Sequence, residues 1–223
     1  EVPAHSGWGF GNPDVVACPL WDVGDINHGD IQALKINSNA TYTFLTEFLT
    51  ERRTLFPPEA SAHWHMGGDE MFAECLDQQP GLKPWMATHN ISDYNALQQY
   101  FTKRLRTDVL PKLRPQPPIV VWEQNSGLAI ADSSIGAEDI GQVYGGDASG
   151  IVKIVRGGRA ATFSPDAWYL PGTSDATDWE SVYAYEPNST AVAASMAPTD
   201  WAKVYGGEFC FWGEHTSDSN LET

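Results

Sequence analysis

Residues 63–70, HWHMGGDE, constrain the fold most, because they end a short apolar strand with two glycines and two adjacent carboxylates. Alternate side chains of a strand share a face, so His63 and His65 point to the same side. The two glycines allow a sharp turn and a close approach of the backbone to a ligand. Since Asp69 and Glu70 are neighbours, their side chains point in different directions, which suits two different chemical roles.

Three interpretations of this carboxylate pair follow from the residues alone. Repulsion between neighbouring carboxylates raises the proton affinity of at least one of them, as a general acid needs. A solvated pair at a helix start, stabilised by the helix dipole, explains the same residues equally well. In the third interpretation His63 and His65 bind a metal ion with Asp69, which requires further ligands from other strand ends.

Short strand-like patterns alternate with longer helical patterns along the chain. We predict helices at 41–55, 93–113 and 151–156, and strands at 62–66, 118–122, 140–144, 159–163 and 204–212. This alternation favours parallel β/α units. Polar and aromatic residues gather where the predicted strands end: Asp69, Glu70, Trp122, Glu123, Tyr144, Trp168, Tyr169, Trp212 and Glu214. Because such ends meet at one mouth of a barrel, the sequence predicts an α/β fold of the (β/α)8 TIM-barrel type, with a doubly wound open sheet as the alternative.

Composition excludes several classes of partner. The 223 residues suffice for one sizeable domain, and their net charge of −16 would repel a nucleic-acid backbone. No apolar run approaches the roughly 18 residues that a membrane span needs. Nine Trp, eight Tyr and nine Phe serve either ordinary core packing or stacking against sugar rings. Three glycosylation sequons, at Asn39, Asn90 and Asn188, favour a secretory route.

The sequence resembles a known enzyme family. Residues 65–70, HMGGDE, match the His-x-Gly-Gly-Asp-Glu signature of the family 20 glycoside hydrolases, the β-N-acetylhexosaminidases. Further segments resemble the family in the same order: residues 39–45, 121–123, 168–170 and 206–214. Residues 1–5, EVPAH, are similar to the family's Asp-x-Pro-Gly-His, with Glu for Asp and Ala for Gly. The resemblance covers nearly the whole chain and is strongest for eukaryotic lysosomal and secreted members.

The resemblance implies a retaining hydrolysis in which the acetamide oxygen of the substrate attacks the anomeric carbon and forms an oxazolinium intermediate. Glu70 would be the general acid and later the base, Asp69 would hold the acetamide N–H, and Tyr169 would donate to the acetamide oxygen. The remaining expected site residues would bind the sugar or support the carboxylates: Trp122, Tyr144, Trp168, Trp212, Glu214, His65 and His5. The implied substrates are terminal N-acetylglucosamine or N-acetylgalactosamine residues of glycoconjugates or chitooligosaccharides, and no cofactor or metal is implied.

The resemblance also implies features outside the site. Cys18 and Cys75 match positions that form a disulfide in the lysosomal members, which leaves Cys210 as a buried free thiol. A lysosomal, vacuolar or secreted location is expected, and a homodimer for the full-length protein.

Three departures from the family pattern are visible. Pro171 stands where the family usually has an Asp or Asn that binds a sugar hydroxyl, and Tyr144 stands where a tryptophan is common. The family pattern further indicates that residues 1–223 form a partial catalytic domain, from the end of barrel strand 3 through strand 8. We therefore expect the chain alone to be poorly stable and weakly active at best. Two alternatives remain: a catalytically impaired, sugar-binding relative, and a metal-dependent hydrolase that uses His63 and His65.

Overall fold

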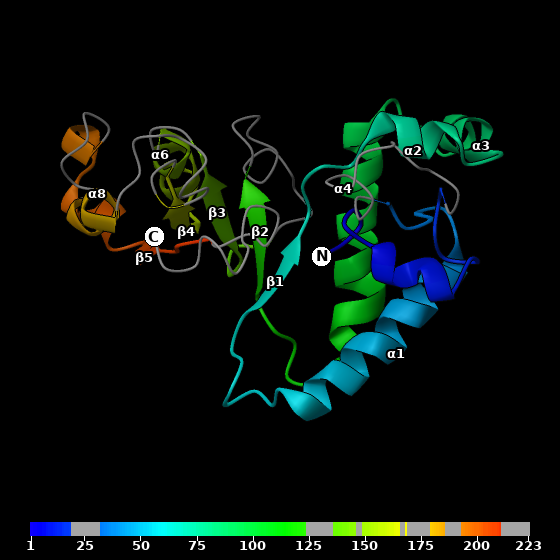
Figure 1. Ribbon diagram of the computed structural model, residues 1–223, viewed down its shortest axis with the longest axis horizontal. Helices are drawn as coiled ribbons and strands as arrows, with labels where there is room; N and C mark the ends of the chain where they lie inside the picture. Colours follow the sequence, from blue (N-terminus) through cyan, green and yellow to red (C-terminus); the bar gives the residue numbers. More distant parts are fainter. Residues whose placement is uncertain are drawn as a thin grey trace. The chain divides into compact units, whose positions relative to one another are not determined.

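The computed structural model describes residues 1–18, 32–123, 136–145, 149–165, 168, 179–185 and 193–210 (Figure 1). The chain forms two compact units. Residues 1–121 and 132–136 make the first unit, and residues 122–131 and 137–223 make the second. No helix in the described ranges combines the length and the apolar character that crossing a membrane requires.

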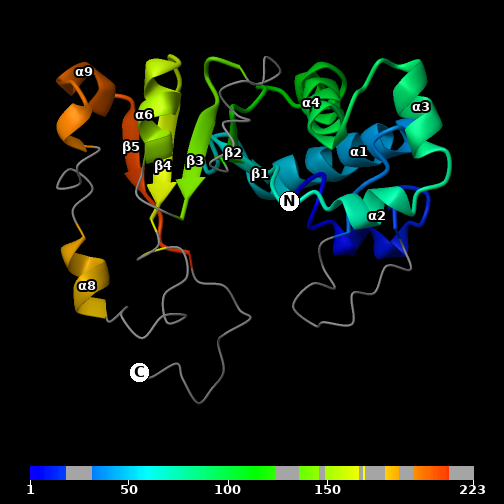
Figure 2. The same ribbon diagram turned by 90° about the horizontal axis from the view of Figure 1, so that it is seen from above.

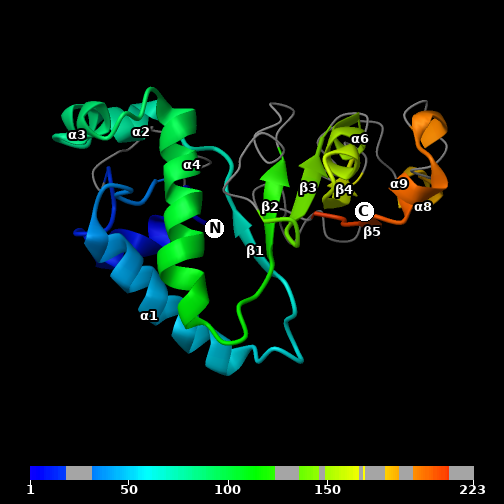
Figure 3. The ribbon, with the colours of Figure 1, turned by 180° about the vertical axis from the view of Figure 1, so that it is seen from behind.

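Two long helices support the first unit (Figure 3). Helix α1 (Asn39–Leu55) buries Leu45 and Leu49 on one face and stops just before two prolines. Helix α4 (Tyr94–Arg104) continues into a π-helical turn, η2 (Leu105–Val109), and a 3-10 turn, η3 (Leu110–Lys112), and both turns pack against α1. The helix predicted at 93–113 is therefore three segments, because Pro111 has no N–H to continue the α-helical ladder.

Strands β1 (Trp64–Gly67) and β2 (Ile119–Glu123) pair in parallel. The N-terminus lies beside β1, where the Val2 N–H donates to the Met66 carbonyl at 2.8 Å. Two short helices that periodicity did not predict follow β1: α2 (Ala73–Asp77) and α3 (Leu82–Thr88). A 3-10 turn, η1 (Gly7–Gly11), precedes them near the chain start.

The first unit contains the expected disulfide. Cys18 and Cys75 are joined across a sequence separation of 57 residues, which ties the N-terminal segment to α2. Both cysteines are almost fully buried.

The second unit is a parallel β/α arrangement (Figure 2). Its strands are β3 (Ile140–Tyr144), β4 (Ala160–Ser164) and β5 (Val204–Gly207). Helix α6 (Ser149–Arg156) packs on β3 and β4, and the smaller elements are α8 (Trp179–Ala184), η5 (Ala193–Ser195) and α9 (Pro198–Trp201). The core consists of residues from α6, β3 and β4: Val143, Ile151, Ile154, Val155, Ala161 and Phe163.

The order of the strands bears on the fold class. In the first unit β2 is the parallel neighbour of β1, and in the second unit β3, β4 and β5 are parallel neighbours in chain order. A barrel adds each new strand beside the previous one, so the order within each unit agrees with the predicted barrel.

Candidate active site

The turn after β1 is built from residues with left-handed backbone conformations. Gly67 has φ +76° and Gly68 has φ +98°, values that L side chains rarely adopt. The Gly67 N–H donates to Nδ1 of His65 at 3.0 Å, and Gln98 of α4 donates its amide to the Gly68 carbonyl. A Cβ at Gly67 would lie 2.5 Å from the Cβ of Glu1, so glycine is what lets Glu1 approach the turn. His65 thus accepts a hydrogen bond within the turn that precedes Asp69 and Glu70, and its support of the two carboxylates stays a prediction.

The N-terminal segment winds around one buried hydroxyl. The Oγ of Ser6 lies 3.2 Å from the Glu1 carbonyl oxygen, 3.1 Å from that of Pro3 and 3.2 Å from that of Ala4. The side chain of Ser6 is fully buried. This winding places His5 in a left-handed conformation with φ +52°. As a result, Glu1 and His5 both lie close to the turn after β1.

His5 contacts the expected general acid. Its Nε2 lies 3.0 Å from Oε2 of Glu70 and 3.9 Å from Oε2 of Glu1. The hydrogen bond to Glu70 is the main cause that raises the pKa of His5 above its usual value, and burial opposes it. The structure therefore brings together His5, Asp69 and Glu70, and it adds Glu1 to them.

Asp69 is the buried member of the pair, with 6% of its surface exposed. Its Oδ1 has no hydrogen-bond partner within the described ranges. Burial, followed by the charge of Glu1, raises the pKa of Asp69 to about 7. The carboxylate pair thus contains one group with raised proton affinity, as expected. Burial is the larger cause, and the charge of Glu70 contributes less.

Two expected aromatic residues lie together in the second unit. Trp122 and Tyr144 meet edge to face, with ring centroids 5.3 Å apart and an interplanar angle of 78°. Trp168 instead stacks on Phe163 at 5.4 Å and meets Tyr185 edge-on. These contacts show Trp168 as part of the core packing, and its contact with a sugar stays a prediction.

Other expected residues lie outside the described ranges: Tyr169, Pro171, Asn188, Trp212 and Glu214. Of the two described sequons, Asn39 stands at the start of α1, where its Oδ1 accepts from both terminal nitrogens of Arg104 at 3.2 Å. Asn90 is exposed, with φ +56°.

The alternative metal site at His63 and His65 is not the cluster that the structure presents. His63 is exposed, and Nδ1 of His65 accepts from Gly67. Among the described residues, one group of His, Asp and Glu side chains is close enough to share an ion, and it consists of Glu1, His5 and Asp69. Sequence reasoning missed Glu1 as a site residue. Its place in the segment EVPAH, where the family has Asp, was the available signal.

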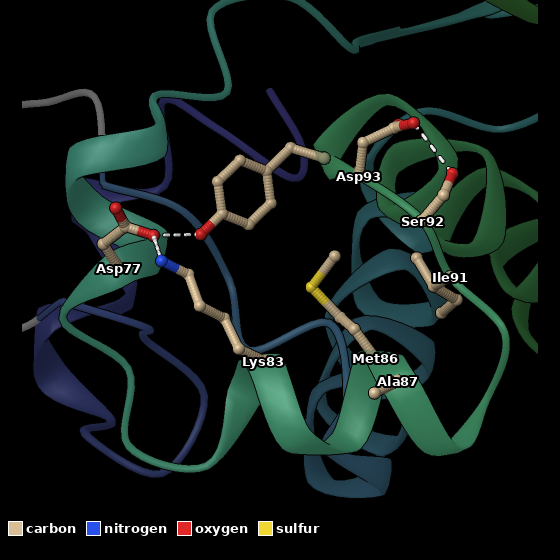
Figure 4. A pocket seen from close by; sticks show the side chains of 8 residues that line it. Asp77, Lys83, Met86, Ala87, Ile91, Ser92 and Asp93 are labelled. Atoms are coloured by element: carbon tan, nitrogen blue, oxygen red, sulfur yellow. Dashed lines mark hydrogen bonds and ion pairs between the residues drawn. The ribbon is translucent and has the colours of Figure 1, made fainter.

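A separate pocket of about 430 Å³ lies between α2, α3 and the start of α4 (Figure 4). Asp77 accepts hydrogen bonds from Lys83 at 2.8 Å and from the Tyr94 hydroxyl, so the polar groups of the rim already pair with one another. Met86 contributes to its apolar lining. None of the expected site residues lines this pocket.

Parallel β/α units with polar side chains at the carboxyl end of a strand are typical of the α/β-barrel class of proteins. The whole chain, residues 1–223, matches the model of glycosyl hydrolase family 20, catalytic domain, and the chain belongs to that family.

Known proteins agree with this membership. The chain is 28% identical to the rat beta-hexosaminidase subunit alpha over 99% of its own length, and 29% identical to beta-hexosaminidase subunit A1 of Dictyostelium discoideum over its full length. It spans about 40% of each of these relatives. The structure of Flavobacterium johnsoniae chitobiase superposes with a TM-score of 0.74 at 23% identity, covering 97% of this chain and 32% of that one. This likeness shows the TIM-barrel fold.

Proposed function

We propose that this chain carries the acid–base machinery of a β-N-acetylhexosaminidase that works by substrate-assisted, retaining hydrolysis. The observation that supports this proposal most is Oδ1 of Asp69, a buried acceptor without a donor in the described part of the chain. A buried carboxylate oxygen that lacks a partner is costly, and an N–H from a ligand relieves that cost. The acetamide N–H of an N-acetylhexosamine is such a donor, and Glu70 lies next along the chain to supply the proton.

In the proposed first step Glu70 donates its proton to the glycosidic oxygen as the bond from this oxygen to the anomeric carbon breaks. The acetamide carbonyl oxygen of the substrate forms the new bond to that carbon, and Asp69 accepts a hydrogen bond from the increasingly positive N–H. In the second step Glu70 takes a proton from water, which attacks the anomeric carbon and opens the oxazolinium ring. His5, 3.0 Å from Glu70, orients the acid for both steps.

The aromatic residues and the remaining roles extend the proposal. Trp122 and Tyr144, already in edge-to-face contact, would line the acetamide pocket. Tyr169 would donate to the acetamide oxygen, while Trp212 and Glu214 would bind the sugar. The substrates would be terminal N-acetylglucosamine or N-acetylgalactosamine residues of glycoconjugates or chitooligosaccharides. The disulfide suits an oxidising compartment, which supports a lysosomal, vacuolar or secreted location with glycosylation at Asn39, Asn90 or Asn188.

The test uses the protein with its full catalytic domain, and it compares release of an aryl group from N-acetyl-β-glucosaminide and from plain β-glucoside. We expect cleavage of the acetamido sugar alone, and a loss of at least a hundredfold in kcat for Glu70→Gln. Glu59→Gln, an exposed glutamate outside the site, is the matched control and should keep full activity. Equal cleavage of both sugars would contradict substrate assistance, and normal turnover by Glu70→Gln would contradict the role of Glu70.

A catalytically impaired, sugar-binding protein is the second candidate, because Pro171 stands where the family offers a side-chain acceptor to the sugar. Binding of N-acetylglucosamine without any turnover by the native protein would favour it. A metal-dependent reaction predicts a loss of turnover in excess EDTA, and turnover that survives EDTA would exclude it.

A further inference from the structure

We propose that Glu1, His5 and Asp69 form a binding site for a divalent transition-metal ion of the zinc type, and that the ion blocks the acid pair. The binding of the ion stands without the proposed function, because it can be measured in the absence of any substrate, whereas the block rests on the roles proposed for Asp69 and Glu70.

The first argument is geometric. One donor atom from each of the three side chains lies within 4.8 Å of the others. Donors bound to one zinc ion at about 2.1 Å lie roughly 3.4 Å apart in a tetrahedron, so modest side-chain rotations complete the site. The side chain of Glu1 is 27% exposed, while His5 is held by the segment wound around Ser6.

The second argument is the state of Asp69. Its side chain is more than nine-tenths buried, and Oδ1 has no hydrogen-bond partner in the part of the chain that the structure describes. A buried carboxylate oxygen needs a donor or a cation. A metal ion held by Asp69 and its two neighbours would satisfy this oxygen directly.

The third argument is the chemistry of the donor set. One imidazole nitrogen with two carboxylates suits zinc and its neighbours in the first transition row, whereas calcium and magnesium prefer oxygen ligands alone. Three protein ligands leave a fourth position for water. The net charge of −16 raises the local concentration of cations around the protein.

Metal binding would oppose the contact between His5 and Glu70. Nε2 of His5 is the atom that lies 3.0 Å from Glu70, and it is also the atom nearest to Glu1, so the ion and Glu70 compete for it. The ion would also occupy Asp69. The bound state is therefore an inhibited state, in which Glu70 loses its histidine partner and Asp69 cannot accept an N–H.

The experiment titrates the EDTA-treated and dialysed protein with ZnCl₂ by isothermal calorimetry, and with CoCl₂ by visible absorption. We expect one ion per chain and the absorption bands of a low-coordinate cobalt site with nitrogen and oxygen ligands. Glu1→Gln and His5→Asn should each weaken binding at least tenfold, since loss of a direct ligand costs no less than loss of a supporting hydrogen bond. His63→Asn is the matched control and should bind normally.

Thermal unfolding without metal shows whether each variant folds. If His5→Asn unfolds, Glu1→Gln decides, because glutamine is nearly isosteric with glutamate. Zinc should raise the Tm of the native protein and of His63→Asn, but not that of Glu1→Gln. The proposal is overturned by a native protein that binds no zinc at millimolar concentration, by a folded Glu1→Gln that binds as tightly as native, or by a loss confined to His63→Asn.

Discussion

At the scale of single residues, the buried carboxylate of Asp69 makes the stability of the folded protein depend on pH. Its pKa is raised to about 7, mainly by burial, so the folded chain binds a proton between pH 4 and pH 7 that the unfolded chain does not. Stability connected with this group is therefore present below the unfolded pKa near 4 and is lost as pH rises through 7. The folded chain bears the full cost of the buried charge above that pH.

Replacing Asp69 with Asn should therefore stabilise the protein at pH 8 and leave little difference at pH 4.5. We expect a gain of roughly 2–4 kcal/mol at pH 8, because Asn occupies the same space without the charge. Urea unfolding of both proteins in EDTA at the two pH values measures it. Asp108→Asn is the control: Thr107 and Arg104 lower the pKa of Asp108, so that variant should lose stability at pH 8. A gain for Asp69→Asn that is equal at both pH values would contradict burial of the charge as the cause.

Gly67 gives a second prediction at this scale. Alanine there meets both an unfavourable φ of +76° and the Cβ of Glu1 at 2.5 Å. Gly81 has a similar φ of +79° but nothing within 4 Å of an added Cβ. We expect Gly67→Ala to cost about 2–4 kcal/mol and Gly81→Ala about 1–2 kcal/mol in urea unfolding. The difference between the two variants measures the contact with Glu1, and equal costs would show that Glu1 simply moves aside.

The same residues show what a sequence can reveal about a site. The segment HMGGDE was sufficient to single out Asp69, Glu70 and His65, and the resemblance of EVPAH to the family pattern added His5. The raised pKa of Asp69 and the contact of Glu1 with Gly67 depend on burial and on residues more than 60 positions apart. No local pattern contains that information.

At the scale of elements, helix α4 follows its local signals closely. Asp93 is a residue type that favours the N-cap, and its Oδ1 accepts from the Ala96 N–H at 2.8 Å. Strands β2, β3 and β4 also lie within one residue of their predicted ranges, because their apolar runs are short and are bounded by polar or glycine residues. Helices α2 and α3 were missed, because five and seven residues are too few to show a helical period.

Capping offers a matched test between two helices. Ser38 precedes α1 as Asp93 precedes α4, but the Ser38 side chain makes no capping hydrogen bond. Asp93→Ala should lower Tm by about 2–4 °C, whereas Ser38→Ala should leave it nearly unchanged. Differential scanning calorimetry of the two variants beside the native protein decides. Equal shifts would mean that the Asp93 hydrogen bond adds nothing to α4.

At the scale of the whole molecule, the alternation of strands and helices was sufficient to predict parallel β/α units, and the residues gathered at the strand ends favoured the barrel. The family match and the likeness to a solved chitobiase agree with that prediction. The disulfide could come only from the resemblance, since three cysteines allow three pairings and no spacing rule selects one.

Thiol accessibility provides the last prediction, because the three cysteines differ in state and not only in burial. Cys210 is 7% exposed, and its Sγ lies 3.5 Å from Oγ of Ser164, so the folded protein should react with no alkylating reagent. Unfolding without reductant should expose one thiol, and unfolding with reductant should expose three, each counted by the mass that alkylation adds. Reduction of the Cys18–Cys75 bridge should also lower the free energy of unfolding by about 2–4 kcal/mol. Without the bridge the unfolded chain has more conformational entropy, which favours unfolding. Three thiols after unfolding without reductant would contradict the bridge. One reactive thiol in the folded protein would show instead that the reagent reaches Cys210 and the adjacent ends of β4 and β5.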